Sequence, residues 1–187
     1  MIEINDEVRQ SLTDAGIGKR YHDVSLNSVP LYGDGLMKLL TSRGHEVRQG
    51  TLSIAWHGVG LTESITMFCR ALHVNGVGCL LRPLVRMRPI INDAEFKEQV
   101  RDIDVMVILN GQDTTRGNPL HDAVMSELEF VLRQRHDNRK ATFIQLAVPE
   151  DHVITDLPNR YWSDEFLSLM NDGYARVTPS SLTGKAK

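Results

Sequence analysis

The fold of this chain is indicated by one stretch, Ser53-Ile54-Ala55-Trp56-His57-Gly58-Val59-Gly60-Leu61-Thr62-Glu63-Ser64. An apolar strand pattern comes first, two glycines follow, and a helical pattern begins at Glu63. Phosphate-binding loops have this arrangement, with the consensus G-x-x-x-x-G-K-[ST]. Only the final hydroxyl, on Ser64, stands in its expected place, because Glu63 occupies the position of the lysine that reaches the β- and γ-phosphates.

The remaining loop positions depart from the consensus as well. His57 and Thr62 stand where the two glycines belong, and this removes the freedom to curl the backbone around a phosphate. A carboxylate about 4 Å from a phosphate charge is repelled by roughly 4 kcal/mol at a surface-like dielectric, which corresponds to about three orders of magnitude in affinity. We therefore predict a degenerate nucleotide site, formed by His57, Gly58, Gly60, Thr62, Glu63 and Ser64, that has lost ATP and Mg²⁺.

Strand and helix patterns alternate along the rest of the chain. The expected strands are residues 51–56, 77–81, 105–109, 142–148 and 174–177, and the expected helices are residues 31–43, 63–74, 93–101, 118–136 and 164–170. Strands separated by helices pair in parallel through right-handed crossovers. We therefore expect an α/β fold, a three-layer sandwich with a parallel sheet, in which ligands bind beyond the carboxyl ends of the strands.

Composition limits the classes of function. The 187 residues contain 41% hydrophobic and 24% charged residues, and the net charge of −3 gives no global basic field for nucleic acid. No run is long enough to span a membrane, and the acidic start lacks a signal-peptide core, so a cytoplasmic protein is expected. We divide the chain into an N-terminal extension and entry motif (1–30), a degenerate domain (31–178) and a disordered tail (179–187).

Four segments, in order, resemble the helicase-loader and transposition ATPases of the DnaC/IstB type, within the AAA+ class. Residues 16–26, GIGKRYHDVSL, are similar to the entry motif of that family. Residues 50–64 occupy the place of its Walker A loop, and residues 104–111 that of its Walker B strand. Residues 132–144, LRQRHDNRKATFI, are similar to its helix end and following strand. The resemblance implies a P-loop NTPase (AAA+-like) sheet with a small or absent C-terminal lid.

The departures from that family concern its catalytic residues. Leu109 and Asn110 stand where the resemblance places two Walker B acids, which would hold Mg²⁺ and polarise the attacking water. Ala147 stands at the place of the sensor asparagine, and residues 166–173 contain no arginine. We therefore expect no catalytic residues and no ATP hydrolysis. Because about fifteen residues precede the entry motif, we do not expect direct helicase loading.

Two segments of the chain are basic, and the first of them could contact other molecules. Arg82, Arg86 and Arg88 lie within seven positions that contain no acidic residue, so they could contact nucleic-acid phosphates or form a solvated or partner-binding surface. Residues 133–140 carry a second basic cluster at a helix end, where the helix dipole favours cations. Neither the histidines nor Cys69 and Cys79 have metal-ligand spacing, so we expect no metal site and two buried thiols.

The predicted function is that of a non-catalytic, DnaC-like pseudo-ATPase of DNA replication or of phage and mobile-element biology. It would bind a replicative helicase, an active AAA+ relative or single-stranded DNA, possess no membrane partner, and join an oligomer. Two alternatives stay open: a divergent ATP-binding enzyme such as a helicase-loader ATPase, nucleotide hydrolase or kinase, and an inhibitor that mimics a loader subunit.

Overall fold

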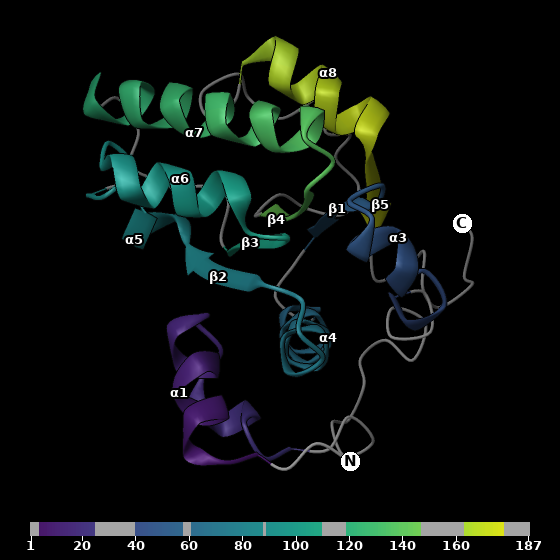
Figure 1. Ribbon diagram of the computed structural model, residues 1–187. Helices are drawn as coiled ribbons and strands as arrows, with labels where there is room; N and C mark the ends of the chain where they lie inside the picture. The colour runs from purple at the N-terminus through teal and green to yellow at the C-terminus, as the bar shows by residue number, and fades with distance from the viewer. Residues whose placement is uncertain are drawn as a thin grey trace.

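A five-stranded parallel sheet lies at the centre of the chain (Figure 1). The computed structural model describes residues 4–24, 40–57, 61–87, 89–109, 119–146 and 163–177. The strands are β1 (Ser53–His57), β2 (Cys79–Pro83), β3 (Val105–Leu109), β4 (Ala141–Leu146) and β5 (Tyr174–Val177). Their order is β2-β3-β4-β1-β5, and every neighbouring pair is parallel.

Helices cover both faces of the sheet and confirm the three-layer prediction. In Figure 1, α6 (Ala94–Asp102), α7 (Pro119–Asp137) and α8 (Asp164–Gly173) lie above the sheet, and α1 (Asp6–Asp14) and α4 (Thr62–Val74) lie below it. The short α3 (Gly44–Arg48) contributes to the same core cluster as α1 and α4. A 3₁₀ turn, η1 (Lys19–Tyr21), follows α1, and α5 (Leu84–Met87) follows β2 directly.

The alternation of side chains along each strand builds two cores. On β3, Val105 and Val107 pack in the cluster with α1 and α4, whereas Met106 and Ile108 pack in the cluster with α6, α7 and α8. All four side chains are fully buried. Successive side chains of a strand point to opposite faces, so a strand covered on both sides is apolar at every position. The continuous apolar run of residues 105–109 therefore predicted this strand with its observed bounds.

Helix α1 was not expected from the sequence, where residues 1–30 read as a polar extension with a loop-like entry. The Asn5 side chain caps the helix by accepting a hydrogen bond from the backbone N–H of Val8. Leu12 and, after the helix, Ile17 are buried in the α4-side core. The carbonyl of Ala15 accepts a hydrogen bond from the backbone N–H of Leu81 (2.7 Å), so this segment also covers the edge strand β2.

Other expectations were met in part. Four of the expected helices are present with shifted ends, and the short helices α3 and α5 were not predicted. Of the expected helix 31–43, residues 31–39 lie outside the described residues, and residues 40–42 are helical. The predicted tail, residues 179–187, also lies outside them. Within the described part of the chain, no helix has the length and apolar character required to cross a bilayer.

Candidate functional site

The predicted nucleotide site lies where β1 ends and α4 begins. Strand β1 ends at His57 and α4 begins at Thr62, with Gly58 and Gly60 outside the described residues. The N-cap residue of α4, Leu61, has no side chain that could cap the helix, and the first turn of α4 contains Glu63. A carboxylate in a first helical turn is favoured by the helix dipole. Glu63 therefore has a structural role at this helix end that needs no phosphate.

Glu63 is paired with two residues of the entry motif. Arg20 Nη2 lies 3.4 Å from Glu63 Oε1, and the Tyr21 hydroxyl donates to the same oxygen at 3.2 Å. The Arg20 guanidinium stacks on the Tyr21 ring, 4.6 Å from its centroid, and also donates to its hydroxyl. Burial raises the pKa of Tyr21, so its phenol is protonated and can donate.

This pairing weakens the phosphate repulsion expected from the sequence. The figure of roughly 4 kcal/mol holds for an unpaired carboxylate, but Glu63 lies beside a cation and its side chain is 50% exposed. Solvent and Arg20 both screen the charge of Glu63, so the repulsion of a phosphate is smaller than that figure. The position of the lysine is therefore occupied by a carboxylate in a solvent-exposed ion pair with Arg20.

The neighbouring site residues are engaged within the protein. The Gln145 amide of β4 donates to Thr62 Oγ1 at 3.2 Å, and Ser64 is only 2% exposed. Leu109, at the end of β3, packs against the α4-side core, so the first Walker B position carries an apolar side chain that cannot bind Mg²⁺. Asn110 and Ala147 lie outside the described residues. The structure thus brings Thr62 together with Gln145, which the sequence analysis did not single out.

The entry motif is held against α4 by a further set of contacts that the sequence analysis missed. Arg70 of α4 donates to the backbone carbonyl of His22 from Nε (2.9 Å) and Nη2 (2.6 Å). The buried His22 ring contacts the carbonyl of Ile17 through Nε2 at 2.9 Å. These contacts fix the backbone on either side of Arg20 and Tyr21. The opposite charges of Arg20 and Glu63 allowed an ion pair, but the two residues are 43 positions apart, so no local sequence pattern predicted it.

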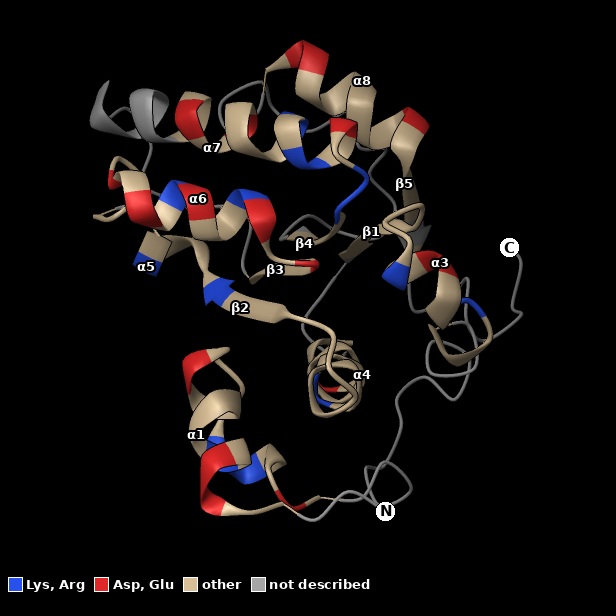
Figure 2. Ribbon diagram, viewed as in Figure 1, with Lys and Arg blue, Asp and Glu red and all other residues tan. Residues whose placement is uncertain are grey.

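The basic segment after β2 divides into different roles. Figure 2 marks Lys and Arg in blue at the end of β2 and on α5. Arg82 donates to the carbonyls of Leu81 (3.0 Å) and Asp14 (2.8 Å), and burial lowers its pKa. Arg86 is exposed, and Arg88 lies outside the described residues. Arg82 therefore fastens the end of α1 to β2, whereas Arg86 projects toward solvent.

The second basic cluster contains a residue with an unexpected environment. Arg135 is fully buried and donates to the carbonyls of Val100 (2.5 Å), Ile103 (2.7 Å) and Ala141 (2.5 Å). Its Nε also donates to Thr142 Oγ1 at 3.1 Å. Burial lowers the pKa of Arg135 to about 10, so it stays protonated at neutral pH. The helix-end interpretation is therefore wrong for Arg135, which joins α6, α7 and β4.

Two further observations concern ligands. A cavity of about 330 Å³ lies between α3 and α4 and is lined by Thr41, Gly44, His45, Arg48, Phe68, Ala71, Leu72 and Asn75. It therefore lies along the later turns of α4 rather than at Thr62 and Glu63. Among the described residues, no three His, Cys, Asp or Glu side chains form a group that could hold a metal ion.

Comparison with solved structures finds the same fold in proteins of DNA replication. A DnaC helicase loader is 15% identical (TM-score 0.63), with 86% of this chain covering 99% of that chain. A DnaA replication initiator bound to AMPPCP and single-stranded DNA is 14% identical (TM-score 0.65; 87% and 50% covered). A DNA replication initiation factor is 12% identical (TM-score 0.63; 83% and 49% covered).

These comparisons establish the fold. The chain spans about half the length of the initiation factor and DnaA chains and nearly all of the DnaC chain. No protein-family model matches the sequence, and no curated protein matches it. The predicted P-loop sheet of DnaC-like AAA+ type is therefore confirmed by the arrangement of five parallel strands between helices and by the likeness to these structures.

Proposed function

We propose that this chain is a non-catalytic AAA+-like protein of DNA replication that acts by binding rather than by hydrolysing ATP. The observation that carries the proposal is the Glu63–Arg20 ion pair at the start of α4, where the phosphate-binding lysine would stand. Phosphoryl transfer depends on positioned cations and acids around the phosphates. Here the lysine position carries a carboxylate, and the first Walker B position carries the apolar Leu109.

A thermal denaturation experiment tests the loss of nucleotide binding. Saturating Mg²⁺-ATP at 100 times its dissociation constant would stabilise the folded state by about 2.7 kcal/mol. We expect no change in melting temperature at millimolar Mg²⁺-ATP. A matched titration of MgCl₂ alone controls for ionic effects. A melting temperature that rises with ATP concentration, or release of inorganic phosphate by pure protein, would instead support the alternative of a divergent ATP-binding loader. The DnaA structure of the same fold, which is bound to AMPPCP, is the reason to test this alternative.

The proposed partners are an AAA+ relative or a replicative helicase, and single-stranded DNA. The exposed Arg86 and the single-stranded DNA in the DnaA structure support the DNA interaction. Phosphate contacts make binding salt-dependent, and each contact that is lost lowers the slope of log K against log salt by about 0.7 for a single strand. We expect Arg86→Ala to weaken binding and lower this slope. Unchanged binding and slope would exclude a phosphate contact for Arg86.

Protein partners are tested by co-purification with a replicative helicase and with an ATP-competent loader. Association with the loader in a mixed ring is expected for a cooperating subunit. Association that blocks the activity of that ring would instead identify an inhibitor that mimics a loader subunit. Binding to neither protein would contradict the proposed role.

A further inference from the structure

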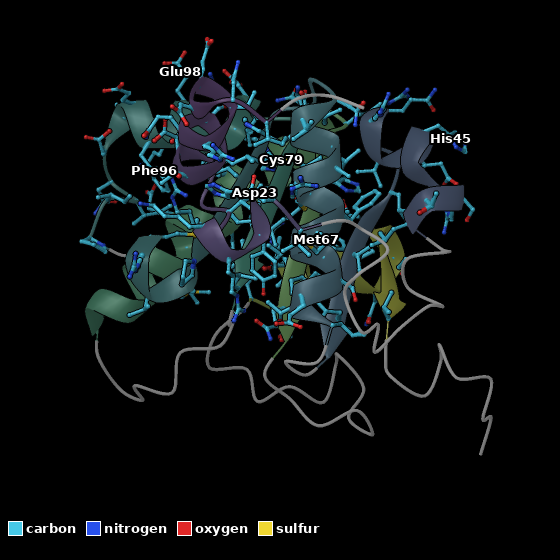
Figure 3. All side chains as sticks on the ribbon, turned by 90° about the horizontal axis from the view of Figure 1, so that it is seen from below. Asp23, His45, Met67, Cys79, Phe96 and Glu98 are labelled. Carbon is cyan, nitrogen blue, oxygen red and sulfur yellow. The ribbon has the colours of Figure 1, made fainter. Side chains whose placement is uncertain are left out.

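The cavity of about 330 Å³ between α3 and α4 lies between two helical faces. The lining residues on α4 have the spacing i, i+3, i+4 and i+7 that forms one face of a helix: Phe68, Ala71, Leu72 and Asn75. The residues that face them have the same spacing, from Thr41 to Arg48. Figure 3 shows α3 beside α4 from below, with His45 labelled on α3 and Met67 on α4.

Small residues on both faces leave this space unfilled. Ala71 lines the cavity on α4, and Gly44 lines it at the start of α3. A Cβ added at Gly44 would meet no other part of the described chain within 4 Å, so this position faces open space. Packed helices normally interdigitate their side chains and leave few voids larger than a water molecule. Ligand pockets have volumes of about 300–1,000 Å³, so this cavity has room for a small ligand.

The floor of the cavity is apolar. Phe68 and Leu72 belong to the α4-side core and are 6% and 5% exposed. The Phe68 ring stacks on Phe143 of β4, with ring centroids 6.5 Å apart, so the sheet holds this wall in place. An apolar floor offers water no hydrogen bonds, and an apolar group that displaces this water gains free energy. The floor therefore favours an occupant with an apolar body.

The rim of the cavity carries a cation without an acidic partner among the described residues. Arg48 is exposed, and its side chain takes part in no hydrogen bond or ion pair within the described ranges. Glu46, the one carboxylate of α3, is engaged by Arg43, which donates from Nε at 2.7 Å and from Nη2 at 2.5 Å. No described residue of the lining is acidic. An anionic group at the rim would therefore meet Arg48 and no like charge from these residues.

We propose that the cavity between α3 and α4 binds a small organic carboxylate, with its apolar body on Phe68 and Leu72 and its carboxylate on Arg48. A guanidinium binds a carboxylate through two parallel hydrogen bonds, which gives this head group its specificity. The cavity lies along the later turns of α4, away from Thr62 and Glu63. Occupation of this site therefore does not depend on whether the chain binds ATP.

A calorimetric titration of the full chain with naphthylacetate tests the site. This probe carries a carboxylate on a compact apolar body, and naphthylacetamide is its uncharged match with the same body. We expect saturable binding of one naphthylacetate per chain with a submillimolar dissociation constant. Naphthylacetamide should bind about fivefold more weakly, because it loses the charge-assisted hydrogen bonds with Arg48, whose exposure to solvent limits their strength.

Variants separate the head-group contact from the apolar floor. Arg48→Gln should remove the preference for the acid over the amide and leave the affinity for the amide unchanged. Gly44→Leu should weaken the binding of both probes, because its side chain enters the cavity, and it should fold, because leucine is a better helix former than glycine. Arg139→Gln is the control with the same loss of charge outside the cavity, and it should keep the wild-type preference.

Four results would each overturn the proposal. The first is the absence of saturable heat with naphthylacetate up to millimolar concentration, and the second is an equal affinity of the wild-type chain for the acid and the amide. The third is an Arg48→Gln protein that keeps the preference for the acid. The fourth is a Gly44→Leu protein that melts at or above the wild-type temperature and binds naphthylacetate as tightly as wild type does.

Discussion

Replacing Arg135 by methionine tests how the buried guanidinium joins three elements. Methionine has a similar length and fits an apolar core, but it leaves the carbonyls of Val100, Ile103 and Ala141 without this donor. A buried acceptor that loses its partner costs about 1–3 kcal/mol. Because the carbonyls at the end of α6 have no helical N–H to replace it, we expect the free energy of unfolding to fall by about 3–5 kcal/mol.

The loss is large relative to the total stability of a domain, which is about 5–15 kcal/mol. At about 2–4 °C per kcal/mol for a chain of this length, the melting temperature should fall by about 10 °C. Urea denaturation followed by circular dichroism measures the free energy, and a thermal scan measures the melting temperature. Arg139→Met is the matched control, because Arg139 is exposed on the turn that follows the same helix, and it should stay within about 0.5 kcal/mol of wild type.

The result that would refute this reasoning is an Arg135→Met protein as stable as the Arg139→Met control. That outcome would mean that the carbonyls find water or other donors at little cost. Arg135→Lys adds a second check, since a lysine ammonium cannot reproduce the planar set of donors that the guanidinium directs to α6 and β4. We expect Arg135→Lys to be destabilised nearly as much as Arg135→Met.

Three further predictions concern other contacts. Arg82→Ala should lower stability by about 1–2 kcal/mol, because it removes hydrogen bonds to two carbonyls, whereas Arg86→Ala should leave chemical denaturation unchanged. Gly50→Ala should destabilise by at least about 1 kcal/mol, because residue 50 has a φ of +67° and an added Cβ would meet a backbone carbonyl; equal urea midpoints would contradict this. Burial opposes ionisation of Asp104, but Lys140 and the Gly78 N–H outweigh it and lower its pKa. A carboxyl group whose pKa is lowered in the folded state stabilises the fold above its unfolded pKa, and this stabilisation is lost as the pH falls below about 4. Asp104→Asn should therefore reduce the loss of unfolding free energy that wild type shows between neutral pH and low pH.

The central sheet was predictable from sequence because its signal is local. Residues 105–109 are apolar at every position, which is typical of a strand buried on both faces, and the expected strand has the observed bounds. Helix α1 was missed for the opposite reason. Its apolar stripe is sparse, with Leu12 fully buried and Val8 partly buried among polar residues, and its anchoring contacts come from α4 and β2.

The candidate site was predictable in its location but not in its contacts. The order of strand, glycines and helix placed Glu63 and Ser64 correctly at the start of α4, which begins one residue before the expected helix, at Thr62. The partner of Glu63 is Arg20, 43 positions earlier, and no periodicity connects them. The same limit applies to Arg135, which the sequence analysis placed in a basic cluster at a helix end. Arg135 is buried because α6 and β4 pack around it, and a local sequence pattern does not predict such tertiary contacts.

The most direct test of the proposed loss of nucleotide binding is a calorimetric titration of the pure protein with Mg²⁺-ATP. We expect no saturable heat up to millimolar ATP, both for the wild-type chain and for Arg20→Ala, in which the ion pair with Glu63 is removed. A saturable isotherm of one ATP per chain would contradict the proposed loss, and a dissociation constant near 1 μM would mean about −8.2 kcal/mol of binding free energy from a site that lacks its lysine.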